Sequence, residues 1–120
     1  MTKDKNNPGK EPFDLHERTR AFSLEVIYFF SRLKKDDVNM ILGRQLLRAA
    51  TSIGANYAEA DHARSKAEFK SKIGDCLKEA GETKYWLMLF KQYGNKDGKL
   101  PPILDESIQL EKIRYTIFYS

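Results

Sequence analysis

The sequence has only one cysteine and two histidines, and each scarcity excludes a class of site. Cys76 can form no disulfide within the chain, and without a second cysteine it supports neither a zinc ribbon nor a Cys-x-x-Cys redox motif. We expect Cys76 to pack as a small apolar residue. No apolar run approaches the roughly 20 residues that a membrane-spanning helix needs, and the polar residues 1–12 do not resemble a signal peptide. The expected location is therefore cytoplasmic.

The chain also lacks the alternation of polar and apolar residues that marks β-strands, so we expect little or no sheet. Its 120 residues make one domain, too short to hold a catalytic domain and a cofactor domain together. The formal charge of +4 is moderate. It permits binding to nucleic acid without requiring it.

Four segments instead carry apolar residues at helical spacing. The predicted helices span residues 14–35, 38–61, 65–94 and 101–120. Asp14 and Ser65 are each followed three residues later by glutamate, a helix-start pattern, and Gly94 stands where a left-handed helix cap is expected. Short loops favour antiparallel neighbours. We therefore predict an all-α fold, an up-down-up-down antiparallel four-helix bundle over residues 14–120, preceded by a disordered tail at residues 1–13.

The second predicted helix carries two stripes at helical spacing. The apolar stripe is Leu42, Leu46, Ala49, Ile53 and Tyr57, and it predicts a core-facing side. The polar stripe is Gln45, Arg48, Ser52, Asn56 and Glu59. Either this stripe is solvated, or it packs against another helix or subunit through small residues such as Ala50, Gly54, Ala55 and Ala58. We favour packing, because an exposed helix face usually carries long charged side chains.

The same segment carries a family resemblance. QLLRAATSIGANYAEA at residues 45–60, followed by Phe69 and by KEAGETKYWLML at residues 78–89, resembles the small four-helix-bundle proteins encoded in intervening sequences of 23S ribosomal RNA genes. The resemblance covers residues 15–120; Ala60 stands where many members carry glycine, an exchange that concerns the helix end. It implies a bundle that assembles as a homopentamer, and its relatives include an accessory protein of diversity-generating retroelements.

The polar residues of the two motifs can be interpreted as a structural network. Glu79 and Glu82 share one face of the third helix, where Arg48 could hold one of these carboxylates in a bidentate pair. A catalytic carboxylate site is the alternative; we favour structure and expect no enzyme activity. Of the adjacent Tyr85 and Trp86, the outward side chain is a candidate for a subunit seam or a stacking surface. The predicted network or oligomer interface comprises Gln45, Arg48, Ser52, Asn56, Glu59, Glu79, Glu82 and Trp86.

A di-metal centre is the main cofactor hypothesis that a helical bundle invites. Glu59-x-x-His62 matches one element of such a centre, but the site needs two Glu-x-x-His elements, and the chain has only His16 and His62. We therefore expect no metal and no cofactor.

Basic residues gather around the start of the third predicted helix. They are Arg64, Lys66, Lys70, Lys72 and Lys78. A solvated face explains them as well as a nucleic-acid surface does in a single chain, but a pentamer would repeat any basic patch five times and multiply phosphate contacts. We therefore predict an oligomer that binds structured RNA or DNA through backbone contacts, as an accessory to a reverse transcriptase or another nucleic-acid enzyme. The alternative is a protein-interaction scaffold with no direct nucleic-acid role.

Overall fold

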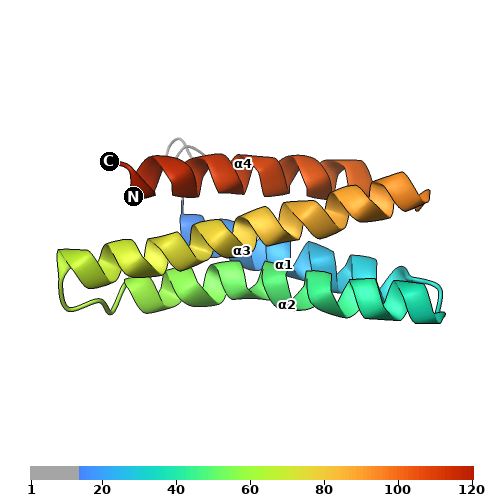
Figure 1. The fold of residues 1–120 in the computed structure, drawn as a ribbon, viewed down its shortest axis with the longest axis horizontal. Helices are drawn as coiled ribbons and strands as arrows, with labels where there is room; N and C mark the ends of the chain where they lie inside the picture. The colour runs from blue at the N-terminus through green and yellow to red at the C-terminus, as the bar shows by residue number, and fades with distance from the viewer. Residues whose placement is uncertain (1–13) are drawn as a thin grey trace.

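The computed structural model describes residues 14–120, which form four α-helices and no strand. They are α1 (Leu15–Arg32), α2 (Asp37–Ala60), α3 (Lys66–Tyr93) and α4 (Leu100–Phe118). Each helix packs against the next along the chain, α1 also contacts α4, and the chain reverses direction at each connection (Figure 1). The all-α prediction is confirmed, whereas the predicted tail at residues 1–13 lies outside the described residues. None of the four helices is long and apolar enough to cross a bilayer.

The helix boundaries follow from local capping chemistry. The Asp14 carboxylate accepts hydrogen bonds from the backbone N–H groups of His16 and Glu17. The Ser65 hydroxyl accepts one from the backbone N–H of Glu68. Side-chain acceptors at these positions satisfy N–H groups that have no partner within the helix. Gly94 ends α3 in the left-handed region at φ 100°, as predicted. The predicted first helix is too long at its end, because Leu33 is already extended.

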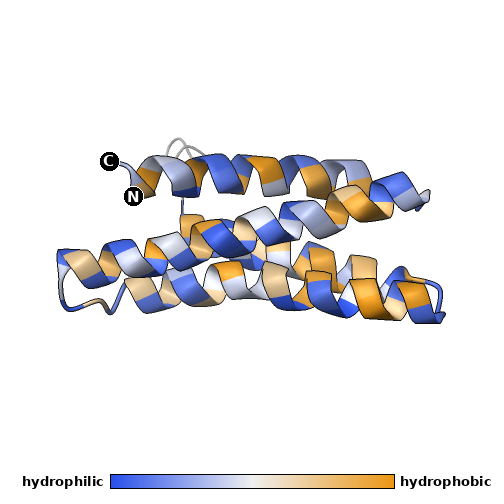
Figure 2. Ribbon diagram, viewed as in Figure 1, coloured by the Kyte–Doolittle hydropathy of each residue, from blue (hydrophilic) through white to orange (hydrophobic). Residues whose placement is uncertain are grey.

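The core occupies the inner stripe of every helix. Hydrophilic and hydrophobic residues alternate along each helix in Figure 2, as amphipathic helices require. Phe29 of α1 and Phe90 of α3 meet edge to face, with ring centroids 5.3 Å apart. Cys76 is fully buried, which confirms its predicted packing role. Phe69 of α3, which belongs to the motif of the family resemblance, is partly exposed.

Gly43 sets the close approach of α2 to α1. A Cβ atom at this position would lie 2.7 Å from Cδ1 of Phe30 and 2.9 Å from a methyl carbon of Leu33. We expect Gly43→Ala to lower the free energy of unfolding by about 1–3 kcal/mol, because the added methyl group overpacks the interface. Gly98→Ala is the matched control, since nothing lies within 4 Å of its Cβ position. Urea denaturation of both variants measures the difference; equal stabilities would contradict this account of the helix contact.

Candidate functional site

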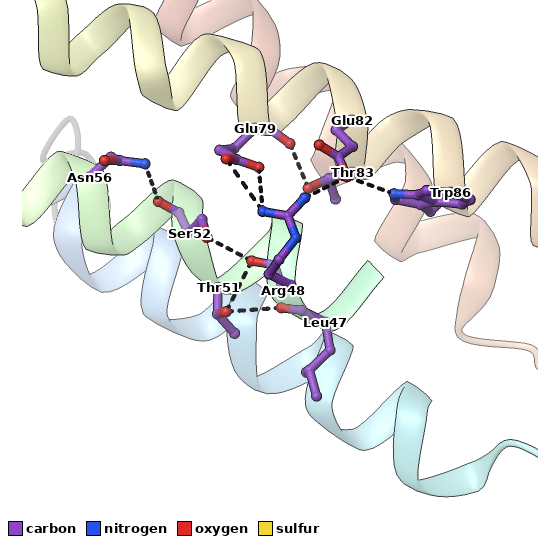
Figure 3. Close-up of polar contacts among 9 residues, drawn as sticks. All are labelled: Leu47, Arg48, Thr51, Ser52, Asn56, Glu79, Glu82, Thr83 and Trp86. Atoms are coloured by element: carbon purple, nitrogen blue, oxygen red, sulfur yellow. Dashed lines mark hydrogen bonds and ion pairs between the residues drawn. The ribbon is translucent and has the colours of Figure 1, made fainter. Parts of the chain in front are cut away.

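The centre of the candidate site is the guanidinium of Arg48, which reaches from α2 to two carboxylates on α3 (Figure 3). Its Nη1 donates to Glu79, with 3.3 Å to the nearer carboxylate oxygen, and its Nη2 donates to Glu82. The indole N–H of Trp86 donates to the same Glu82 oxygen at 3.1 Å. The sequence predicted that Arg48 holds one carboxylate, and the structure places both against it. The arrangement fixes the register of α2 against α3 at this point.

The network is only partly sheltered from water. About half of the Arg48 side chain is exposed, whereas Glu79 is largely covered. The hydrogen bond from Arg48, followed by the one from Trp86, holds the pKa of the Glu82 carboxyl below its ordinary value. The same Glu82 contact raises the pKa of Arg48. The exposed half of the Arg48 side chain faces solvent, where a partner molecule could contact it.

The depressed pKa of Glu82 predicts a pH dependence of stability. An unfolded glutamate titrates near about pH 4.3. The contribution of Glu82 to the free energy of unfolding should therefore be complete above that pH. It should be lost as the pH falls through the lower pKa that Glu82 has in the folded protein. We expect the melting temperature of the wild type to exceed that of Glu82→Gln above about pH 5, and the gap to close in acid. Thermal denaturation followed by circular dichroism across this range makes the measurement; a gap that does not change with pH would contradict the assignment.

The other predicted members of the network lie along α2 and mainly contact their own helix. The Ser52 hydroxyl donates to the carbonyl of Arg48 at 2.7 Å, and the Asn56 amide donates to the carbonyl of Ser52 at 3.0 Å (Figure 3). Glu59 instead bridges to α3, where it lies 2.7 Å from Nζ of Lys72. The side chain of Gln45 is exposed. The α2–α3 seam thus contains two separate ion-pair groups, one at Arg48 and one at Glu59.

Exposed apolar side chains continue the seam beyond Arg48. Ile41 lies two helical turns before Arg48 on the same face of α2, and Tyr93 lies two turns after Trp86 on α3. Both are about 61% exposed. Tyr85 is also largely exposed and packs edge to face on the half-buried Trp86, so Tyr85 is the outward member of the aromatic pair. The α2–α3 seam therefore combines a half-exposed ion-pair network with the exposed side chains of Ile41 and Tyr93.

The predicted basic cluster divides into exposed and ion-paired members. Lys66, Lys70 and Lys78 are exposed and lie in no ion pair within the described part of the chain. Lys70 is directed toward α4, with its Nζ 4.9 Å from the ring centroid of Phe118. Lys72 lies on the α2 side, where the hydrogen bond to Glu59 raises its pKa. The Arg64 side chain is 91% exposed, and its Nε lies 3.9 Å from Oε1 of Glu68, a loose ion pair.

Glu59 and His62 show no metal-binding geometry. Glu59 is paired with Lys72, and His62 is exposed at the end of α2. Across residues 14–120, no group of three or more histidine, cysteine or acidic side chains could hold a metal ion.

Sequence reasoning missed Arg114, which is fully buried in α4. Its guanidinium carbon lies 4.4 Å from the ring centroid of Tyr57 on α2. The apolar periodicity of α4 gave no indication of it, because a charged residue within an amphipathic helix is ordinarily assigned to the solvent face. Helical spacing does put Arg114 on the buried face of α4, since it lies four residues after Leu110 and seven after Ser107, both of which are buried.

Comparisons with known proteins cover most of this arrangement. The profile of a family described as 23S rRNA-intervening sequence protein matches residues 11–113. The crystal structure of a protein of unknown function from the S23 ribosomal protein family of Bacteroides thetaiotaomicron is similar, with a TM-score of 0.79 and 30% identity over 88% of this chain and 98% of that chain. No curated protein matches the sequence. The matched region includes the Arg48 network and the basic start of α3.

Proposed function

Because this chain belongs to the 23S rRNA-intervening sequence protein family, we propose that it is a non-enzymatic accessory protein that binds structured RNA or DNA. In this proposal the up-down-up-down bundle assembles as a cytoplasmic homopentamer. The assembly contacts the nucleic-acid backbone and assists a reverse transcriptase or another nucleic-acid enzyme.

The observation that carries the proposal is the set of free cations on α3. Lys66, Lys70 and Lys78 project from one helix with no carboxylate partner among the described residues. Free lysines can neutralise phosphates and release counterions, and this release supplies most of the affinity for a nucleic-acid backbone. Arg64, at the turn before α3, extends the same end of the bundle.

Assembly would strengthen such weak contacts. A ring repeats the lysines of α3 at fixed spacing, so that one RNA can contact several copies at once. A closed ring needs two different surfaces that fit each other. The α2–α3 seam supplies one candidate surface, with half-exposed Arg48 at its centre and exposed Ile41 and Tyr93 at one end. A second candidate is the outer side of α1, where Leu24, Ile27 and Tyr28 are all exposed.

These exposed apolar groups also favour a second candidate function. If they bind a partner protein, the chain is a protein-interaction scaffold and its net charge is incidental. The two functions differ in their salt response, because phosphate contacts weaken steeply as salt rises, whereas apolar contacts do not.

The test is a titration of fluorescent structured RNA and duplex DNA with purified protein, followed by anisotropy at several salt concentrations. The proposal predicts a Kd at or below about 1 μM at low salt, with log K falling linearly against log salt concentration. Absence of binding even at low salt would refute direct nucleic-acid binding and leave the scaffold function.

A further inference from the structure

Arg114 is a buried charge without a hydrogen-bonding partner. Its side chain has no exposed surface, and none of its three guanidinium nitrogens meets an acceptor among the described residues. Arginine carries five N–H donors and stays protonated in proteins. Nearly all buried polar groups in folded proteins are hydrogen-bonded, so an exception of this size calls for a physical explanation such as a bound ion.

The immediate neighbours of Arg114 do not supply the missing negative charge. The face of the Tyr57 ring offers a cation–π contact but no hydrogen-bond acceptor along the guanidinium edge. Burial raises the pKa of the Tyr57 hydroxyl and of the Cys76 thiol, so both groups are neutral near pH 7. Burial is also the main cause that lowers the pKa of Arg114, while its neighbours Cys76 and Tyr57 act in the opposite direction.

Two acidic side chains on the elements around Arg114 are engaged elsewhere. Glu106 binds Arg18 through both carboxylate oxygens, at 2.6 and 2.9 Å. Asp61 lies 2.6 Å from Nε2 of His16. Arg18 also acts on Arg114 as a neighbouring like charge. Neither carboxylate therefore serves as a counterion for Arg114.

We propose that Arg114 is the anchor of an oxyanion-binding site between α2, α3 and α4. A carboxylate or phosphate accepts two parallel hydrogen bonds from the edge of the guanidinium, while the Tyr57 ring covers the face of the guanidinium. This is the geometry in which arginine binds oxyanions most strongly. This inference does not depend on nucleic-acid binding.

The start of α1 borders the site. His16 stacks on Tyr57 with ring centroids 4.3 Å apart, and Arg114 contacts the same ring. Inorganic phosphate has the oxyanion chemistry that the guanidinium edge can bind, and it serves as the probe of the site.

Thermal denaturation of the full chain tests the site, with inorganic phosphate at about 10 mM compared with sodium chloride of equal ionic strength. The variants are Arg114→Met and the control Arg20→Met, which removes an exposed arginine of α1. Phosphate also stabilises proteins in general. The quantity compared is therefore the phosphate-induced rise in Tm of each protein, relative to the rise measured for Arg114→Met. If Arg114→Met does not fold, Arg114→Lys replaces it, with phosphate affinity expected to fall at least about tenfold.

The proposal predicts that phosphate raises the Tm of the wild type and of Arg20→Met by several degrees more than that of Arg114→Met. Equal responses in the wild type and Arg114→Met overturn the proposal. So does an Arg114→Met protein that melts above the wild type in phosphate, because a bound oxyanion would make the buried charge more stable than its apolar replacement.

Discussion

The triple variant Lys66→Gln/Lys70→Gln/Lys78→Gln is expected to bind structured RNA about 100-fold more weakly than the wild type at low salt. These lysines are exposed and lie in no ion pair among residues 14–120, so each is available to neutralise a phosphate. The slope of log K against log salt should fall by about two to three, since it counts the phosphates contacted. Fluorescence anisotropy of labelled RNA measures both quantities.

A matched control removes the same charge at the opposite end of the bundle. Lys34→Gln/Lys35→Gln/Lys96→Gln alters the α1–α2 and α3–α4 turns, which lie together at the other end (Figure 1). If general charge attraction caused the binding, the two triple variants would lose affinity equally, and the assignment to α3 would be wrong. A single Lys72→Gln change should cost less, because Lys72 must first leave Glu59.

The Arg48→Ala variant is expected to dissociate the proposed oligomer into single chains. Within one chain, an exposed ion pair contributes at most about 1 kcal/mol, so the fold should persist. At an interface the loss leaves Glu79 and Glu82 close together without their counterion, and the repulsion and desolvation of two carboxylates cost several kcal/mol. Sedimentation velocity of the purified variant reports the mass, and circular dichroism reports the fold.

Lys84→Ala is the control for this variant. Lys84 also forms an ion pair from α3, with Glu111 of α4 at 2.7 Å, but on the α3–α4 side away from Arg48. The Lys84→Ala protein should sediment with the same assembled mass as the wild type. An Arg48→Ala protein that retains both its mass and its melting temperature would remove the α2–α3 seam from the proposed interface.

The helices were predictable from sequence because their signals are local. Ser65 and Gly94 delimit α3 through contacts within a few residues of themselves. The pairing of Arg48 with the third helix was also predictable, because Glu79 and Glu82 share a face and one facing arginine can reach them.

Contacts that depend on how the helices pack against one another, without a local signal, were not predictable. The sequence placed Lys72 in the free basic cluster, since nothing in α3 alone shows that Glu59 of α2 lies within 2.7 Å. Arg114 is the larger omission. Its burial depends on where α4 settles against Tyr57 and Cys76, and hydrophobic periodicity describes only one helix at a time.

The most direct test of a nucleic-acid-binding oligomer is sedimentation velocity of the wild-type protein with fluorescently labelled structured RNA, at low and at physiological salt. The account predicts that the protein alone sediments at about five times its 13.9 kDa chain mass. At low salt the RNA should move with that assembly, and it should be released as salt rises. RNA that sediments alone at every salt concentration, beside an assembled protein, would contradict the nucleic-acid role; a protein that sediments as single chains would contradict the ring.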